Sequence, residues 1–491
     1  MTAVTGRRLR VLRTISLSVV LLGFVVQLSL LGKAGMPSWI SRGIFFAFDP
    51  LILLQHLAAV HRVLLYALAA LIPLALTLVI GRFFCGWICP FGAIHEFITW
   101  IAGKRQTPGS RPDRKLLRIK YLTLAAVIVA ALAGTTLGGW LDPFAFLTRS
   151  SSAALEPALS SYALRTGWAR VAVQPVLIGM IFLAVLLLNA WKRRFFCNAL
   201  CPLGALYGLF GRFSRMRLET TSACTGCRKC TARCTYNGGP SSEQLKSECN
   251  LCFACVADCP TGCVQVRFAS AAGPGARLDL GRRRLLGATA VGLGLAAFSH
   301  AGAEAQLGNK AGHSFLRPPG AVSEKQFLPL CLRCGQCVQA CPTNFIQPSL
   351  LEGGFQGLWT PVLNARTGYC SFECNLCTQA CPTGALEPLT KARKQAFKMG
   401  TATINHNRCL RDVEGSDCSV CLEKCPVPGK AIRLQIQSRP MLERQDRAKE
   451  LLVVADSCTG CGICEHFCPV GAAQGITVSA ENEDREAAAL V

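Results

Sequence analysis

The sequence predicts a multidomain protein in which an α-helical membrane domain precedes two small α+β modules built around cysteines. Two observations predict this architecture. Four long apolar segments lie within the first 191 residues, and such segments are typical of membrane-spanning helices. The chain also holds 29 cysteines, nearly all in clusters with gaps of two or three residues. A secreted disulfide scaffold would be short and would rarely repeat this spacing, so the cysteines indicate metal thiolates.

The membrane domain is predicted at residues 1–212, with four transmembrane helices. Four apolar segments are each long enough to cross a bilayer. They are 11–31, 63–80, 119–138 and 171–191. Lys and Arg cluster before the first segment, between the second and third, and after the fourth. Loops rich in Lys and Arg stay in the cytoplasm, so these three places are expected to be cytoplasmic.

The formal net charge of +24 is distributed unevenly along the chain. Residues 1–305 carry +22, whereas residues 306–491 carry +2. A basic surplus confined to the part with apolar helices is expected from membrane insertion. We therefore predict a lipid bilayer as a partner and no nucleic acid.

The membrane domain contains an internal repeat. The stretches FFCGWICPFGAI (83–94) and FFCNALCPLGAL (195–206) match closely, and each follows an even-numbered helix. Cysteines four residues apart lie on one face of a helix, so two such pairs could supply four thiolates to an additional iron or iron–sulfur site. These cysteines are Cys85, Cys89, Cys197 and Cys201. The alternative is that they pack at helix–loop junctions or serve as thiols.

A first cysteine module is predicted at residues 213–270. It repeats CxxCxxCxxxC, with the quartets Cys224, Cys227, Cys230, Cys234 and Cys249, Cys252, Cys255, Cys259. This repeat is typical of a two-cluster ferredoxin, in which three thiolates hold one [4Fe–4S] cluster and the fourth crosses to its neighbour. By this rule Cys259 joins the first cluster and Cys234 the second. Zinc is the competing metal, but zinc sites do not usually end such a run with proline. Cys263 lies outside every quartet and is expected to pack as a small residue.

The stretch 281–306 resembles an export signal placed inside the chain. Three arginines precede an apolar run that ends in Ala303-Glu304-Ala305, which has the small-residue pattern of a signal-peptidase site. It is predicted to be a twin-arginine signal or a fifth transmembrane segment. A short buried helix or apolar linker is the alternative.

A second ferredoxin-like module is predicted at residues 321–480, followed by an acidic tail at 481–491. It contains four quartets, each ending in Cys-Pro. They are Cys331, Cys334, Cys337, Cys341; Cys370, Cys374, Cys377, Cys381; Cys409, Cys418, Cys421, Cys425; and Cys458, Cys461, Cys464, Cys468. With the first module, the sequence predicts six [4Fe–4S] clusters.

Taken together, these motifs resemble a pair of ferredoxin-type membrane proteins joined head to tail. Residues 1–270, with the paired FFCxxxCP motifs, resemble the NapH family of periplasmic nitrate reduction. Residues 281–480 resemble the NapG family, and the MauN and MauM families share the pattern. In the four-cluster ferredoxin subunits of membrane oxidoreductases, the outer two motifs exchange ligands and so do the inner two. That resemblance implies that Cys468 completes the first cluster of the second module and Cys341 the last.

The resemblance implies a quinol dehydrogenase of the bacterial inner membrane. It would draw on the membrane quinol pool and relay electrons to a periplasmic redox enzyme or cytochrome, such as a nitrate reductase, with the first module cytoplasmic and the second periplasmic. Quinol oxidation needs a proton acceptor near the ring. The predicted quinol-site residues are Asp49, Asp142, His56 and His61, chosen because ionisable residues within a membrane domain mark functional sites. The alternatives are an electron donor for metalloenzyme maturation, as in NosR-type proteins, or a redox sensor or scaffold.

Overall fold

The computed structural model describes most of the chain, and it divides into two compact units. The described residues are 3–31, 37, 43–61, 65–101, 114–155, 173–234, 236, 238–240, 245–268, 280–307, 316–350, 354–436, 449–471 and 474–487. The first unit comprises Met1–Ser29, Gly43–Ala154 and Val176–Phe298. The second comprises Leu30–Arg42, Leu155–Pro175 and Ser299–Val491. The helical domain and the first cysteine module therefore belong to one unit.

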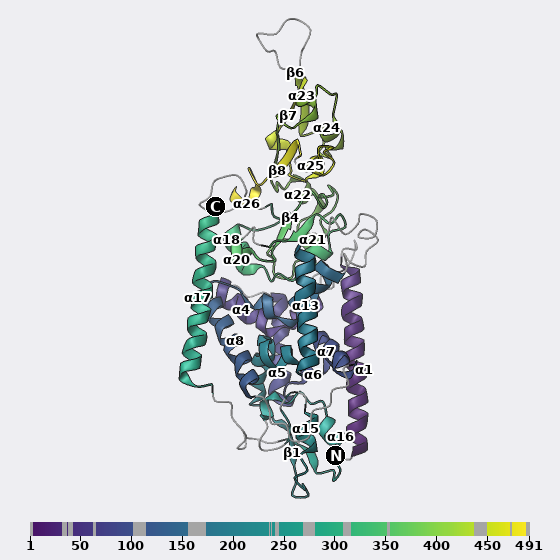
Figure 1. Ribbon diagram of the computed structural model, residues 1–491, viewed down its shortest axis with the longest axis vertical. Coiled ribbons are helices and arrows are strands. Elements are labelled where there is room, and N and C mark those ends of the chain that lie inside the picture. The colour runs from purple at the N-terminus through teal and green to yellow at the C-terminus, as the bar shows by residue number, and fades with distance from the viewer. Residues whose placement is uncertain are drawn as a thin grey trace. The chain divides into compact units, whose positions relative to one another are not determined.

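The four apolar segments and the export-signal stretch are helical (Figure 1). The corresponding elements are α1 (Ala3–Leu30), η1 with α5 (Leu65–Ala70 and Leu71–Ile80), α8 (Arg114–Leu132), α13 (Val173–Trp191) and α17 (Arg282–Leu307). Helix α8 ends six residues before its predicted end. Gly134 adopts a left-handed φ of 81°, and the Thr135 amide donates back to the Ala130 carbonyl. Glycine allows this reversal at a helix end because it has no Cβ.

Short helices pack between the long ones and were not predicted. They are α3 (Ile44–Ala47), α4 (Pro50–Val60), α6 (Phe83–Trp87), α7 (Pro90–Ile101), α9 (Gly138–Leu141), α10 (Pro143–Ser150), η2 (Ser151–Leu155), η4 (Phe196–Leu200) and α14 (Pro202–Gly211). Two of them begin at an Asp-Pro dipeptide, Asp49-Pro50 and Asp142-Pro143. Asp49 caps α4 and Asp142 caps α10, each with proline at the first helical position. Aspartate followed by proline is a strong helix-start signal.

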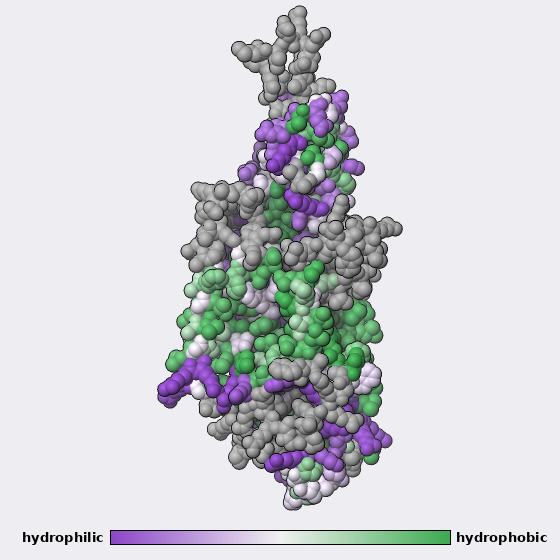
Figure 2. All heavy atoms as spheres, viewed as in Figure 1, coloured by the Kyte–Doolittle hydropathy of each residue, from purple (hydrophilic) through white to green (hydrophobic). Residues whose placement is uncertain are grey.

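The long helices of the first unit expose large apolar side chains. Val19 of α1, Ile72 of α5, Leu132 of α8, Leu187 of α13 and Leu286 of α17 are each at least half exposed. Figure 2 shows these apolar surfaces gathered into a belt. Among the described residues, Val4–Leu30 has the length and hydropathy of a membrane crossing, and Pro50–Val60, Ala67–Ile80 and Pro175–Asn189 are shorter apolar helices.

The first cysteine module closes with an antiparallel pair of strands. Its elements are β1 (Met216–Thr220), α15 (Lys229–Arg233), η5 (Lys246–Glu248), α16 (Ala254–Ala257) and β2 (Val264–Phe268). Thr220 pairs with Val264 and Met216 with Phe268. The hairpin therefore places the residues after β1 beside those that precede β2.

The second unit has the small α+β architecture expected of its cysteine motifs. Its elements are α18 (Glu324–Leu330), α19 (Gln336–Gln339), β3 (Ile346–Pro348), α20 (Gly354–Gly357), β4 (Pro361–Leu363), α21 (Leu376–Ala380), α22 (Lys391–Ala396), β5 (Thr401–Ile404), α23 (Leu410–Val413), α24 (Val420–Lys424), β6 (Ile432–Ile436), β7 (Lys449–Val453), η6 (Ala455–Ser457), α25 (Ile463–His466), β8 (Ile476–Ser479) and α26 (Asp484–Ala487). The pairs β3–β4, β5–β8 and β6–β7 are two-stranded and antiparallel.

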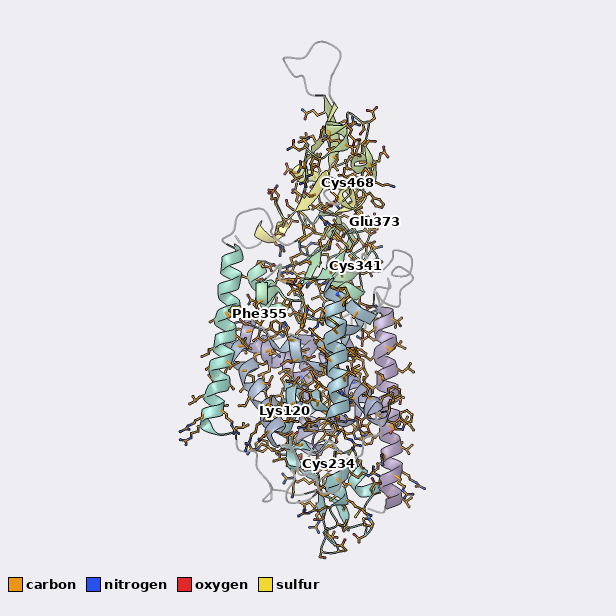
Figure 3. The ribbon with its side chains drawn as sticks, in the orientation of Figure 1. Lys120, Cys234, Cys341, Phe355, Glu373 and Cys468 are labelled. Atoms are coloured by element: carbon orange, nitrogen blue, oxygen red, sulfur yellow. The ribbon has the colours of Figure 1, made fainter. Side chains whose placement is uncertain are left out.

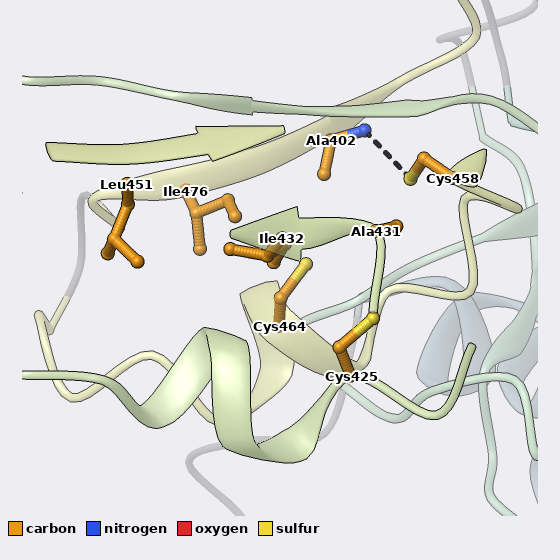
Figure 4. Packing of buried hydrophobic residues seen from close by; sticks show 8 residues of the cluster. All are labelled: Ala402, Cys425, Ala431, Ile432, Leu451, Cys458, Cys464 and Ile476. Atoms are coloured by element: carbon orange, nitrogen blue, oxygen red, sulfur yellow. Dashed lines mark hydrogen bonds between the residues drawn. The ribbon is translucent and has the colours of Figure 1, made fainter. Parts of the chain in front are cut away.

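Cysteines form part of the hydrophobic core of this second unit (Figure 4). Cys425, Cys458 and Cys464 pack with Ile432 and Leu451 in one buried cluster. Small modules of this size bury little apolar surface on their own. The thiols at the centre of the core therefore suggest that a bound group contributes to stability.

Candidate redox site

In the second unit, the first two motifs exchange their last cysteines. Two cavities are each lined by four thiols: site 3 by Cys331, Cys334, Cys337 and Cys381, and site 4 by Cys341, Cys370, Cys374 and Cys377. Strand pairing explains the exchange. The backbone bridge between Ala321 and Leu386 brings the chain before Cys331 close to the chain after Cys381, so Cys381 joins the first motif at site 3. The register of Ile346 opposite Leu363 does the same for site 4.

The last two motifs exchange cysteines in the same way. Site 5 consists of Cys409, Cys418, Cys421 and Cys468, which line one cavity. Site 6 consists of Cys458, Cys461 and Cys464 together with Cys425, which interacts electrostatically with Cys461. Ile404 pairs with Ile476, so the chain after β5 lies beside the chain before β8. Ile432 pairs with Val453 and closes site 6.

This arrangement corrects the exchange implied by resemblance to four-cluster subunits. Cys468 lies with the third motif and not with the first, and Cys341 lies with the second motif and not with the last. Figure 3 shows Cys341 and Cys468 in different parts of the second unit. The physical reason is the strand register, because each hairpin pairs a motif with its neighbour along the chain.

The exchange can be tested by removing single crossing cysteines. We expect Cys381→Ser to lose about four irons, all from site 3, because a cubane loses its fourth thiolate. Cys341→Ser should instead remove site 4. The measurement is iron content with the low-temperature paramagnetic resonance spectrum of the reduced full chain. Exchange between the outer motifs would make Cys468→Ser, and not Cys381→Ser, the variant that loses the site 3 signal.

The first module forms two further sets of thiols. In site 1, Cys230 interacts electrostatically with Cys224 and Cys227, and the β1–β2 register brings Cys259 toward them, since Cys263 contacts both Cys259 and Cys224. Site 2 contains Cys234, Cys249, Cys252 and Cys255, which interact electrostatically. These are the groupings that the spacing predicts. Cys263 is buried, as expected for a small packed residue, but its Sγ lies 3.5 Å from the Sγ of Cys259.

The chemistry of these sites fits clusters more closely than single ions. Among the described residues, no group of three or more His, Cys, Asp or Glu side chains is placed to hold one metal ion. Burial raises the pKa of Cys461 and of Cys421 to about 11. At neutral pH these thiols stay protonated until a cationic iron core replaces the proton. Backbone amides donate to Cys381 and Cys458 at 3.4 Å, and such bonds stabilise cluster thiolates.

The paired CxxxCP motifs of the first unit also bring four thiols together. We call Cys85, Cys89, Cys197 and Cys201 the twin-pair site; their sulfurs interact electrostatically with one another. The second cysteine of each pair precedes a helix with proline at its first position. Gly92 N donates to Cys89 Sγ at 3.4 Å, and Gly204 N to Cys201 Sγ at 3.2 Å. Two helix N-termini therefore face the thiols and favour negative charge there.

Two buried arginines border the twin-pair site with the same pseudo-symmetry. Arg82 and Arg194 are each 1% exposed and precede Phe-Phe-Cys in the two repeats. Arg194 Nη1 lies 3.9 Å from the position that a Cβ on Gly92 would occupy. Arg82 Nη2 lies 3.2 Å from the corresponding Cβ position on Gly204. Each arginine thus reaches the opposite repeat. Neither arginine was among the residues predicted from the sequence, although the repeat extends by one residue toward the N-terminus to include both.

The same arginines hold the first module against the twin-pair site. Arg82 Nη1 donates to Glu248, the residue before Cys249. Lys120 Nζ and Tyr121 Oη donate to the same carboxylate at 2.5 and 2.6 Å. Arg194 Nη1 donates to the hydroxyl of Tyr236. Two ligands of site 2, Cys234 and Cys249, are therefore each within two residues of an arginine partner.

Direct packing brings the backbone of site 2 onto the twin-pair helix α6. A Cβ on Gly86 would overlap the carbonyl oxygen of Asn250, so only glycine allows this approach. Trp87 Nε1 donates to the Leu251 carbonyl at 3.1 Å. Asn250 and Leu251 lie between Cys249 and Cys252. The twin-pair site and site 2 are therefore adjacent.

The structure brings together two of the four predicted quinol-site residues. The Asp49 and Asp142 carboxyl groups are buried and interact electrostatically with each other. His56 is buried on α4, with Nδ1 2.9 Å from the Ile52 carbonyl. His61 caps the far end of α4 and is exposed. An 11-residue helix is about 16 Å long, so His61 lies away from the carboxyl pair.

Comparison with known proteins agrees with the cysteine sites. Residues 63–108 and 173–221, which include the twin-pair cysteines, match a family profile described as a 4Fe-4S binding domain. Residues 330–385 match a 4Fe-4S dicluster domain, which covers sites 3 and 4. Residues 451–474 match a 4Fe-4S binding domain. No solved structure matches the chain.

Curated relatives define the family. The methylamine utilization ferredoxin-type protein MauM of Methylorubrum extorquens is 40% identical over 198 residues, which are 39% of this chain and 86% of the relative. The ferredoxin-type protein NapG of Escherichia coli is 37% identical over 198 residues, 38% of this chain and 81% of NapG. The ferredoxin-type protein MauN of Paracoccus denitrificans is 34% identical over 212 residues, 40% of this chain and 67% of MauN. The chain therefore belongs to the MauM and NapG family of ferredoxin-type 4Fe-4S proteins.

Proposed function

We propose that this chain is a membrane-bound polyferredoxin that oxidises quinol and passes the electrons to a periplasmic reductase such as nitrate reductase. The adjacency of the twin-pair site and site 2 carries the proposal. Gly86 against Asn250 and Trp87 bonded to Leu251 join the membrane-domain thiols to a ferredoxin module within one unit. A [4Fe–4S] cluster bound at these thiols takes one electron at a time, so the two electrons of a quinol can be separated there.

The exposed apolar surface of the first unit supports its placement in lipid. Helices α1, α5, α8, α13 and α17 all present large aliphatic side chains outward. Soluble proteins rarely expose contiguous apolar patches of such extent. Phe97 and Trp100, stacked and exposed on α7, suit the membrane–water interface. We propose that the first four of these helices span the membrane and that α17 is the fifth crossing.

The orientation follows from the charge. Arg282, Arg283 and Arg284 are exposed at the start of α17, and residues 306–491 carry almost no net charge. Basic residues stay on the cytoplasmic side of a crossing. The first module is then cytoplasmic and the second periplasmic.

A periplasm-specific reporter fused after Val491 of the full chain is expected to be active. The same reporter inserted in the basic segment 104–111 should be silent, because that segment is cytoplasmic in this topology. Enzyme activity of the two fusions in whole cells, normalised to their abundance, is the measurement. A silent C-terminal fusion, with an active cytoplasmic reporter at the same position, would reverse the orientation of the second module.

The thiol sites within each unit form a continuous series. In the first unit, Cys255 of site 2 interacts electrostatically with Cys230 of site 1. In the second unit, Cys337 of site 3 interacts with Cys377 of site 4. Cys370 N of site 4 donates to the Cys461 carbonyl of site 6 at 2.8 Å. Site 6 in turn borders site 5. The resulting order, 3–4–6–5, leaves sites 3 and 5 as the ends at which electrons enter and leave.

Quinol-dependent reduction tests the proposed function. The full chain in lipid nanodiscs is mixed anaerobically with ubiquinol or menaquinol, and the visible absorbance of the clusters is followed. Dithionite gives the bleaching of the fully reduced clusters. We expect the quinol to bleach those clusters whose midpoint potentials lie above that of the quinol. If dithionite reduces the clusters and neither quinol reduces any of them, the quinol dehydrogenase activity is refuted.

A further inference from the structure

The Asp49–Asp142 carboxyl pair has the geometry of a buried proton-binding site. Oδ1 of Asp49 accepts from Leu51 N and Ile52 N, and Oδ1 of Asp142 accepts from Phe144 N and Ala145 N. In both residues Oδ2 is buried and has no donor among the described residues. The two carboxyl groups interact electrostatically with each other. Two adjacent buried carboxylates repel each other when both are charged, so the pair favours binding a proton.

Tyr207 connects this pair to the twin-pair site. It is fully buried on α14, the helix that begins at Cys201, and its ring packs 5.2 Å from that of Phe84. The Tyr207 hydroxyl has no hydrogen-bond partner in the described part of the chain. It interacts electrostatically with Asp49 and Asp142 on one side and with Cys85 and Cys89 on the other. A hydroxyl can donate to either neighbour, so Tyr207 can respond to charge on both.

Most other titratable groups around the pair have hydrogen-bond partners of their own. Arg149 on α10 donates to the carbonyls of Gly139 and Trp140 and attracts Asp142. His56 on α4 bonds to Ile52. The remaining groups on neighbouring helices are Lys120 and Tyr121 on α8, bound to Glu248, and His95 on α7, which packs against Phe91 and whose ring nitrogens have no hydrogen-bond partner among the described residues. Tyr207 interacts electrostatically with both the carboxyl pair and the thiols, so it is the group that links them.

We propose that the Asp49–Asp142 pair binds a proton whenever the twin-pair site gains an electron, with Tyr207 linking the two events. The inference rests on the proposed function, in which the twin-pair site holds a redox-active cluster. Quinol oxidation supplies both particles in two successive one-electron steps, and in each step one electron goes to the site and one proton goes to the carboxyl pair. The proton leaves when the electron moves on to site 2. Added charge in a low-dielectric interior is costly, and a nearby proton offsets it.

Redox titration at several pH values tests the linkage without quinol. The full chain in detergent is titrated with mediators, and the twin-pair signal is defined as the paramagnetic resonance signal that Cys201→Ser removes. The midpoint potential is expected to fall with pH by up to about 59 mV per unit, the value for one proton per electron. In Asp49→Asn the slope should vanish, since the amide donates to Asp142 and keeps it charged. Tyr207→Phe should reduce the slope.

Infrared difference spectra of the reduced minus oxidised chain give a second measurement. Reduction should produce the carbonyl band of a protonated carboxyl group in the wild type and not in Asp49→Asn. Glu219→Gln, which removes a carboxylate of the first module paired with Lys246, should keep the band and the slope. A pH-independent potential with an intact signal overturns the linkage, and an unchanged slope in Tyr207→Phe overturns the role of that tyrosine. If the proposed function itself fails, the twin-pair signal or the quinol reduction is absent.

Discussion

Cys201→Ser is expected to lose about four irons and to abolish quinol-driven reduction of the remaining clusters. Cys201 supplies one of four thiols at the twin-pair site and caps α14, where Gly204 N donates to its sulfur. A cubane with three thiolates is not retained in a buried site whose positive surroundings require four. Iron content should fall from about 28 per chain to about 24, the number for six clusters.

Cys201→Ser should block the transfer of electrons from quinol and leave sites 1–6 able to accept electrons from another reductant. Dithionite reaches sites 1–6 independently, so it should still reduce them in Cys201→Ser. Cys263→Ser is the matched control, because Cys263 is a buried cysteine of the same unit that belongs to no predicted quartet and lies beside site 1, not at the twin-pair site. It should keep the full iron content and quinol reduction. A Cys201→Ser chain that retains both would show that the twin-pair cysteines hold no cluster.

Sequence spacing predicted which cysteines form motifs, because a metal cluster demands closely spaced thiols along a local loop. It also predicted the groupings of sites 1 and 2, where exchange between two adjacent motifs leaves one arrangement. In the second unit it did not, since four motifs permit several exchanges. The outcome depends on pairing between distant strands, such as Ile404 with Ile476. Such register is a tertiary property that spacing does not encode.

The docking contacts of the first module were also beyond sequence reasoning. Arg82 and Glu248 are 166 positions apart, and no periodicity relates them. By contrast, the helix starts at Asp49 and Asp142 were readable from Asp-Pro, although the segments that follow are too short to have been predicted as spans. The carboxyl pair itself required the fold, because the sequence shows an Asp-Pro in each half of the domain but does not show that the two carboxyl groups interact.

Glu248→Ala is expected to detach the first module from the helical domain. Glu248 is fully buried and is the shared acceptor for Arg82, Lys120 and Tyr121. Its removal leaves two buried cations without their anion, and breaking a buried ion pair in this way costs about 3–5 kcal/mol. For a unit of this size the thermal midpoint should fall by about 10 °C. Proteolysis within residues 213–268 should accelerate, and site 2 should lose iron.

The loss of stability in Glu248→Ala should come from the uncompensated charges of Arg82 and Lys120 and not from the loss of side-chain packing. Glu219→Gln breaks the more exposed pair with Lys246 and should change stability by less than about 1 kcal/mol. Adding Lys120→Met to Glu248→Gln removes one of the two uncompensated cations, so the double variant should be more stable than Glu248→Gln alone. The thermal midpoint of each variant, measured in the same detergent, decides the question. A double variant less stable than both single variants would mean that Lys120 supports the helical domain by packing, and that the carboxylate does not set the position of site 2 through charge.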